Sequence, residues 1–263
     1  MTQTTGFDPA SLPIRSGLER ESKRAWERLA APGTWWSAEQ RLAIAAESRH
    51  AHSCKLCQRR KTALSPYTVD GAHDAATALP AALVEIIHRL STDAGRVTKT
   101  WLYAMLEIAP ASATASIHGA MMRAAVSEEQ YVETVGIIAL ITALDTFDLA
   151  LGLPQRALPA PRAGAPTRHR PAGAKRDLAW VLTVAPEDLA AGDPDPYTLH
   201  GTKNIHRALS LVPQEVLNFF DFDVELYLKD HEIRDFDTEY RALSHAQIEL
   251  LAGRVSSLNG CYY

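Results

Sequence analysis

The sequence predicts an all-α protein, and three observations favour this fold class. Apolar residues recur at the three- and four-residue spacing of amphipathic helices along most of the 263-residue chain. Several of these segments begin with Ser-x-x-Gln or Ser-x-x-Glu, which is typical of a helix capping box. No convincing run of alternating apolar and polar residues is present, and the β-branched run 135–141 lies inside a helical period. A chain of this length can bury a substantial core.

Five helices are expected in the first part of the chain. They cover 16–31, 37–64, 80–90, 99–108 and 131–151. Capping boxes start the first, second and last of these helices, at Ser16, Ser37 and Ser127. Pro and Gly residues end the same three, at Pro32-Gly33, Ser65-Pro66 and Gly152 with Pro154. The last helix is apolar on most sides, so we expect it to be buried.

The composition changes after this helix. Between 154 and 175, five prolines are mixed with alanine, glycine and basic residues, which predicts an extended linker wrapped over the surface. A nucleic-acid-binding arm is the weaker interpretation, because no aromatic residue is interleaved for base stacking. Further helices are expected over 204–211, 213–220 and 244–258. The predicted organisation is a helical domain over 10–155, a Pro/Arg-rich linker over 156–176 and a second, partial helical unit over 177–263.

The composition also argues against several classes of protein. A net charge of −4 and an isoelectric point near 6.2 give no field that would recruit nucleic acid or an anionic membrane. No apolar run of about 18 residues is present, and the first ten residues lack the basic and apolar regions of a secretory signal. Three cysteines do not make a disulfide scaffold, so the cytoplasm is the expected compartment.

One stretch of the chain recurs in its spacing. Residues 37–54 align without a gap on 244–261, because both begin with Ser-x-x-Gln, continue as an apolar-rich helix and reach a cysteine 17 residues after the serine. Identities are few, so the spacing carries the interpretation of a duplicated helix-then-cysteine unit. The first copy contains Cys54-Lys-Leu-Cys57, whereas the second ends Cys261-Tyr-Tyr263. We therefore expect a truncated second copy without its own dithiol.

The first CxxC motif predicts a thiol redox site. On one continuous helix, a carboxylate, an imidazole, two thiols and an ammonium form a single stripe, namely Glu47, His50, Cys54, Cys57 and Lys61. Cations near a thiol lower its pKa and raise the fraction of reactive thiolate. Two thiols one turn apart can close a disulfide after one of them is oxidised. Because Cys57 lies nearest Lys61, we expect Cys57 to be the more reactive thiol.

Two alternatives remain open for these cysteines. They are either small apolar residues without chemistry, or metal ligands together with His50 and His52. On a single helix His52 points away from the others, so four ligands need a break in the helix or a ligand from elsewhere, such as His73. The three that share a face, His50, Cys54 and Cys57, are the alternative metal set. A break over 52–54 would also place both thiols at a helix N-terminus, which stabilises thiolates.

Three segments of the chain carry a resemblance to a known family. Residues 247–263 contain a helix that leads into Asn259-Gly-Cys261, residues 127–154 form a long apolar helix, and Cys54-Lys-Leu-Cys57 supplies a dithiol. These segments resemble the carboxymuconolactone decarboxylase / alkylhydroperoxidase D-like superfamily, above all its two-unit, peroxidase-related members. The resemblance implies a homo-oligomeric helical bundle in which Cys57 attacks a hydroperoxide and Cys54 resolves the product. Electrons would come from a thiol reductant protein, and no bound cofactor is expected.

The chain departs from this family at its proton relay. The family's glutamate twelve residues before the first cysteine and its histidine four residues after the second are Leu42 and Lys61 here. The second unit keeps its glutamate, Glu249, twelve residues before Cys261. The candidates to replace the missing proton donors are Glu47, His50 and His73.

Two functions from different classes follow from these observations. The first is a peroxiredoxin-type antioxidant oxidoreductase, favoured by the CxxC motif beside cations. The alternative is a catalytically degenerate family member that serves as a binding or oligomerisation module, favoured by the missing relay residues. A zinc site and a decarboxylase-like lyase are lesser alternatives. The expected partners are a hydroperoxide or other small molecule and a second copy of the chain, with neither nucleic acid nor membrane.

Overall fold

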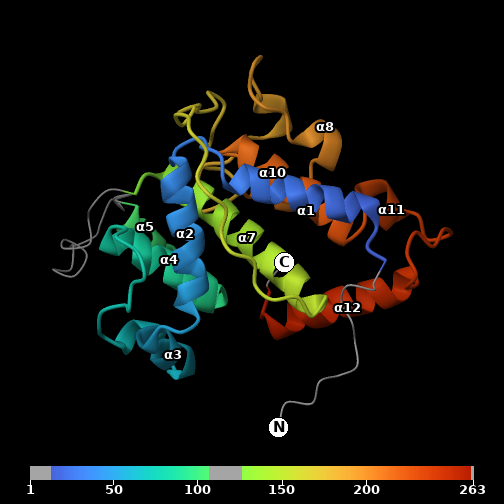
Figure 1. The fold of residues 1–263 in the computed structure, drawn as a ribbon. Coiled ribbons are helices and arrows are strands. Elements are labelled where there is room, and N and C mark those ends of the chain that lie inside the picture. The colour runs from blue at the N-terminus through green and yellow to red at the C-terminus, as the bar shows by residue number, and fades with distance from the viewer. Residues whose placement is uncertain (1–12, 107–125, 262–263) are drawn as a thin grey trace, which may run out of the picture.

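The computed structural model describes residues 13–106 and 126–261, and within these ranges the protein is helical with no strand (Figure 1). An isolated antiparallel bridge joins Lys175 and Thr183. The all-α fold class predicted from the sequence is therefore confirmed. In the part of the chain that the structure describes, no helix is long and apolar enough to cross a membrane.

The helices follow the predicted order closely. They are α1 (Ser16–Leu29), α2 (Ala38–Ala51), α3 (Lys55–Thr62), α4 (Ala81–Asp93), α5 (Lys99–Met105), α7 (Glu128–Ala150), α8 (Tyr197–His200), α9 (Asn204–Arg207), α10 (Pro213–Leu226), α11 (Asp230–Arg234) and α12 (His245–Leu258). Short 3-10 turns lie at η2 (Pro66–Thr68), η3 (Ala94–Arg96) and η4 (Pro186–Asp188). Capping boxes at Ser37, Ser127 and Ser244 are present.

Three expectations about the helices need correction. The capping box at Ser16 is wrong, because α1 begins after Arg15 without a side-chain cap. The continuous helix over 37–64 is also wrong, since α2 ends at Ala51 and α3 begins after Cys54. The helix breaks over 52–54, the alternative that places both thiols at a helix N-terminus. The helix expected over 204–211 is only the four-residue α9. The end of the helix expected over 99–108 lies outside the described residues.

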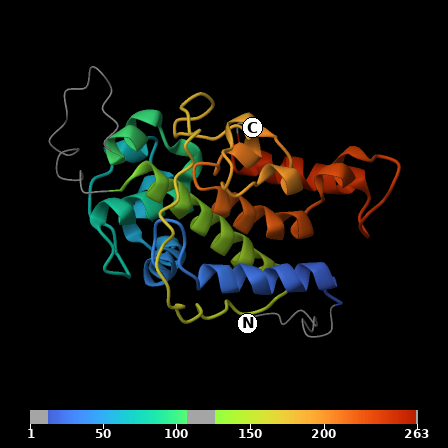
Figure 2. The ribbon, with the colours of Figure 1, turned by 90° about the horizontal axis from the view of Figure 1, so that it is seen from above.

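The long helix α7 lies at the centre of the molecule. It packs against α1, α2, α4 and α10, and Figure 2 shows it running between α1 and α10. Ile137, Leu140 and Leu144 of α7 belong to the same hydrophobic cluster as Val216 and Phe220 of α10. The helices before and after the Pro-rich segment therefore share one core.

The Pro-rich segment after α7 is extended and crosses the surface, as the composition predicts. It is held by backbone hydrogen bonds to the turn between α1 and α2. The N–H of Arg162 donates to the carbonyl of Ala30 over 2.8 Å, and the N–H of Arg168 donates to that of Thr34 over 2.8 Å. We call residues 154–175 the strap, because these bonds fix the segment against the N-terminal helices.

A buried charge cluster joins three helices. Arg41 of α2 lies 2.6 Å from the carboxylate of Glu133 on α7 and 2.7 Å from that of Glu215 on α10, and all three side chains are buried. Burial, with the charge of Glu215, raises the pKa of Glu133 to about 7 even though Arg41 opposes the shift. Arg41 is therefore the counter-ion of both carboxylates. A Cβ atom at Gly33 would lie 1.9 Å from Glu133 Oε1, so this glycine leaves room for the cluster.

Replacing Arg41 by methionine leaves two buried carboxylates without a cation. We expect the free energy of unfolding near pH 8 to fall by about 3–5 kcal/mol, the usual cost of breaking a buried ion pair. Urea unfolding followed by circular dichroism measures this loss. Arg24→Met is the matched control, because Arg24 pairs with Glu21 while its side chain is 50% exposed, and its loss should cost less than about 1 kcal/mol. Similar losses for both variants would contradict the role of Arg41.

The raised pKa of Glu133 makes stability depend on pH. Because the folded-state pKa of about 7 lies above the ordinary 4.5, the folded protein keeps a proton that the unfolded chain has released between these pH values. This contribution to stability is fully present below the ordinary pKa and is lost as pH rises through about 7. The unfolding free energy should therefore decrease from about pH 5 to about pH 8, and Glu133→Gln should flatten that decrease. The same slope in Glu133→Gln and wild type would refute this assignment.

Candidate functional site

The break between α2 and α3 positions the CxxC motif. The N–H of Ser53 donates to the carbonyl of His50 and that of Cys54 donates to the carbonyl of Ala51, which ends α2. Cys54 is the N-cap of α3, and the N–H of Lys55 donates to the Asp74 carboxylate over 3.1 Å. Both thiols therefore lie in the first turn of a helix, where the helix dipole favours a thiolate.

Two histidines face the two thiols. Nδ1 of His73, from the loop before α4, lies 3.5 Å from Sγ of both Cys54 and Cys57. Nδ1 of His88, from α4, lies 3.3 Å from Sγ of Cys57. The ligand atoms of these four residues all lie within 4.8 Å of one another. We call them the Cys2His2 cluster. Its cysteines are 0% and 3% exposed, so the chemistry is shielded from bulk solvent.

Glu47 of α2 orients His88. Nε2 of His88 lies 2.8 Å from Glu47 Oε1, and both side chains are fully buried. The N–H of Ala76 and the hydroxyl of Thr77 also donate to this carboxylate. This network assigns the proton of the imidazole to Nε2, so the lone pair of Nδ1 points at Cys57.

The pKa values of this pair agree with a neutral imidazole beside a carboxylate. Burial lowers the pKa of His88, as does the nearby charge of His73, and the hydrogen bond to Glu47 offsets this only in part. Burial raises the pKa of Glu47, but its hydrogen bonds from Thr77, His88 and Ala76 hold it below the usual range.

Glu85 of α4 orients His73 in the same way. Nε2 of His73 lies 2.6 Å from Glu85 Oε2, and Arg60 of α3 donates to the same carboxylate at 2.8 Å. Burial lowers the pKa of His73, but hydrogen bonds to Cys57, Glu85 and Cys54 raise it to about 10. Burial raises the pKa of Glu85, but His73 and Arg60 bring it down to about 2. The pair is therefore an ion pair whose imidazole faces the thiols.

Several groups act on the pKa of the Cys54 thiol. Burial raises the pKa of the Cys54 thiol, but the N–H of Cys57, His73 and the N–H of Asp74 together hold it below its usual value. A thiolate at Cys54 is thus stabilised by the first turn of α3 and by an imidazole. Lys61, the cation expected from the sequence to activate Cys57, is exposed on α3.

The structure brings together part of the predicted site. Cys54, Cys57 and His73 meet directly, and Glu47 reaches them through His88. His50 lies at the edge, with its ring centroid 6.3 Å from that of His88, and Lys61 is exposed on α3. The continuous stripe of these residues is wrong, because the chain turns at 52–54.

Two residues of the site, Glu85 and His88, were not predicted from the sequence. A signal was present for both, because a carboxylate and an imidazole three residues apart interrupt the apolar helix expected over 80–90. The pattern does not predict that the helix face with Glu85 and His88 points toward the CxxC motif.

The second helix-then-cysteine copy, α12 with Cys261, lies on the surface. Of α12 only His245 is buried, and Cys261 is exposed beyond the end of the helix. Glu249 accepts a hydrogen bond from the Tyr227 hydroxyl and lies 3.6 Å from Nε2 of His245. These contacts stabilise the start of α12 against the end of α10.

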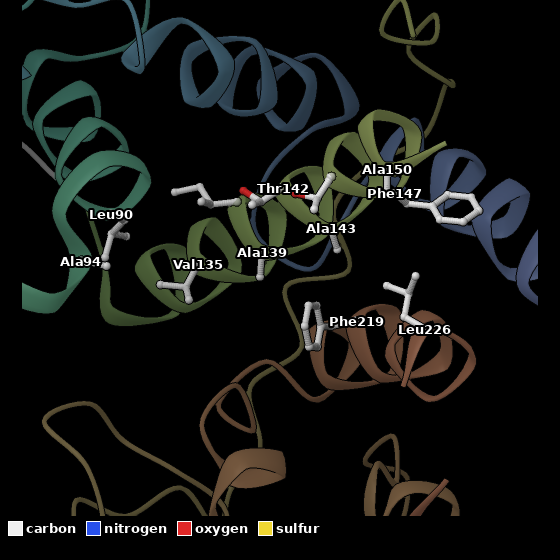
Figure 3. Close-up of a pocket in the computed structure, with 12 residues that line it drawn as sticks. Leu90, Ala94, Val135, Ala139, Thr142, Ala143, Phe147, Ala150, Phe219 and Leu226 are labelled. Carbon is white, nitrogen blue, oxygen red and sulfur yellow. The ribbon is translucent and has the colours of Figure 1, made fainter. Parts of the chain in front are cut away.

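An apolar groove of about 610 Å³ lies between α4, α7 and α10 (Figure 3). Ala139 and Ala143 of α7 form its floor, and Phe219 and Leu226 of α10 form one wall. Among the described residues that line it, none carries an ionisable side chain. The groove can accept an apolar group, but it offers no residues for catalysis.

Comparisons with protein-family models, with curated proteins and with solved structures found no match. The functional assignment therefore depends on the Cys2His2 cluster and its surroundings.

Burial predicts two classes of thiol in the reduced, folded protein. A bulky aromatic disulfide reagent should react quickly with exposed Cys261 and slowly with buried Cys54 and Cys57. Absorbance stopped-flow should therefore resolve one fast and two slow thiols per chain, and Cys261→Ser should remove the fast phase. Three fast thiols in the native protein would contradict the buried position of the CxxC motif.

Proposed function

We propose that the chain is a thiol-dependent, alkylhydroperoxidase-type oxidoreductase that cycles Cys54 and Cys57 between dithiol and disulfide. The observation that carries the proposal is the hydrogen-bonded series from Glu47 through His88 to Sγ of Cys57, with a second thiol in the same cluster. A carboxylate that orients an imidazole, which in turn faces a nucleophile, is the arrangement used to activate cysteine.

The first half-reaction follows from this geometry. Nδ1 of His88 accepts the proton of the Cys57 thiol, and Glu47 stabilises the imidazolium that forms. The Cys57 thiolate attacks the terminal oxygen of the hydroperoxide, the O–O bond breaks, and the alkoxide leaves as an alcohol after taking that proton. Cys57 becomes a sulfenic acid.

The second half-reaction uses Cys54. Its thiolate attacks Sγ of the Cys57 sulfenic acid, the S–O bond breaks, and a disulfide forms. The hydroxide that leaves takes a proton from His73, which faces both sulfurs, and becomes water. The lowered pKa of Cys54 supports this role, because it favours the thiolate that attacks the sulfenic acid. Two electrons and two protons from a partner thiol protein restore the dithiol. Burial of both sulfurs favours a small hydroperoxide over a bulky one.

The family assignment and the duplicated fold belong to the same proposal. In their support, α2 and α12 are both 14-residue helices with a capping box, and in each case a cysteine follows three residues after the helix ends. In the C-terminal copy Cys261 is exposed, whereas Cys54 and Cys57 of the first copy are buried. We therefore assign the reaction to the first unit alone.

Peroxide titration of the full chain tests this proposal. One equivalent of hydroperoxide should remove two of the three thiols, and peptide mapping should link Cys54 to Cys57. His88→Gln should slow the reaction by about 10²–10⁴-fold, the usual contribution of a general base. The matched control is His52→Gln, which changes an exposed histidine two residues before the motif and should react like wild type.

The single cysteine variants test the two roles. Cys54→Ser should give a Cys57 sulfenic acid that a dimedone-type probe traps, whereas Cys57→Ser should give none. The reverse result would exchange the roles of the two thiols. Unchanged thiols in the wild type after peroxide treatment would refute the redox function and favour the binding or oligomerisation module, for which the apolar groove is the supporting observation.

A homo-oligomer is the assembly that the family resemblance implies for this chain. Light scattering coupled to size-exclusion chromatography should give a mass of at least twice the 28.8 kDa of one chain. A monomeric mass at micromolar concentration would count against this assembly.

A further inference from the structure

The Cys2His2 cluster also has the composition of a transition-metal site. Its inward-facing atoms are Sγ of Cys54, Sγ of Cys57, Nδ1 of His73 and Nδ1 of His88. Two thiolates and two neutral imidazoles in a closed four-coordinate arrangement are the ligands that Zn²⁺ takes in structural sites. The thiols, and the His73 imidazole at Nδ1, release their protons when the metal binds. In place of His50, which the sequence groups with Cys54 and Cys57, the structure brings His73 from the following loop and His88 from α4 to the two thiols.

The distances within the cluster fit a single ion. With ordinary zinc bond lengths, tetrahedral geometry separates a sulfur ligand from a nitrogen ligand by about 3.6 Å. The three sulfur–nitrogen hydrogen-bond distances in the cluster are 3.5, 3.5 and 3.3 Å. The side chains therefore need only small movements to bind a metal at their centre.

The residues behind the imidazoles support the same conclusion. Each histidine directs Nε2 at a buried carboxylate, Glu85 for His73 and Glu47 for His88, and so presents Nδ1 to the cluster. Histidine ligands of metals are oriented in this way, with a carboxylate or carbonyl accepting from the other ring nitrogen. Two independent carboxylate–histidine pairs thus converge on one point.

The local packing gives a reason for a metal at this position. Cys54, Leu56 and Cys57 form a small cluster with Val69 that is separate from the main hydrophobic core. Segments with so little apolar packing gain their stability from cross-links such as bound metal. A metal here joins the start of α3, the loop before α4 and α4 itself.

We propose that the reduced Cys2His2 cluster binds one Zn²⁺, and that the metal-bound dithiolate and the Cys54–Cys57 disulfide are alternative states of one site. Metal binding rests on the geometry alone. Release by hydroperoxide rests on the proposed function. In that step the two thiolates lose two electrons and form the S–S bond, the O–O bond takes those electrons with two protons to give alcohol and water, and Zn²⁺ leaves.

Metal titration of the full chain tests the site. The reduced, chelator-treated protein should bind one equivalent of Zn²⁺ in competition with a chromophoric chelator, and Co²⁺ should give the visible spectrum of a tetrahedral thiolate complex. Wild-type protein oxidised with diamide should bind neither ion, and reduction should restore the binding of both Zn²⁺ and Co²⁺. This comparison needs no substitution. Absence of binding to the reduced protein, or equal binding after oxidation, would overturn the proposal.

Substitutions locate the bound metal. His73→Asn should lose stoichiometric binding, and Glu47→Gln should weaken Zn²⁺ affinity by about 10–100-fold, as removal of an orienting carboxylate does elsewhere. His52→Gln is the matched control and should bind like wild type. Circular dichroism confirms that each variant is folded, and wild-type affinity in both His73→Asn and Glu47→Gln would overturn the proposed ligand set.

The two proposals can fail separately. If the reduced protein binds Zn²⁺ but the metal-free thiols do not react with hydroperoxide, the redox function is refuted and the metal site is supported. If hydroperoxide links Cys54 to Cys57 while the reduced protein binds no metal, the metal site fails and the redox function stands.

Discussion

Because Arg41 is buried with Glu133 and Glu215 as its counter-charges, α2, α7 and α10 must meet at one point with their polar groups paired. A buried charge without a partner costs several kcal/mol, so any displacement of one helix is penalised by the other two. The hydrophobic cluster around α7 supplies most of the burial, but apolar contacts are tolerant of sliding. The charge cluster fixes the register in which these helices pack and so fixes the position of the C-terminal end of α2 relative to α7 and α10.

The end of α2 is where the candidate site begins. Glu47 lies six residues after Arg41 on the same helix, and its carboxylate is hydrogen-bonded to Nε2 of His88 from α4. The Cys2His2 cluster is therefore held mainly by hydrogen bonds to buried charged groups such as Glu47. Its own apolar contacts are few. Such a site combines rigid positioning of Glu47 and His88 with a loosely packed loop that carries His73. Both thiol chemistry and metal binding make use of that combination.

Much of the fold could be predicted from the sequence because helix periodicity and capping are local. Ser37-x-x-Gln40 determines where α2 starts, and Cys54 and Cys57 are adjacent in sequence, so the dithiol could be identified directly. His88 could not, because its approach to Cys57 spans 31 residues and depends on how α4 packs on α2. The contribution of Lys61 was overestimated for a similar reason. The stripe that includes Lys61 requires one straight helix, whereas the turn at Ser53 redirects α3 and leaves the lysine in solvent.

Arg41 and Glu215 are far apart along the chain, and this distance in sequence has a consequence for synthesis of the protein on the ribosome. The two residues are 174 positions apart, and the strap bonds from Arg162 and Arg168 to the α1–α2 turn also span more than half of the chain. The N-terminal helices therefore emerge long before the segment that completes their packing. Until α10 has left the exit tunnel, Arg41 and the apolar side of α7 remain uncovered. Contacts of this sequence separation form slowly and late, so the nascent chain is a natural substrate for chaperones that shield apolar helices.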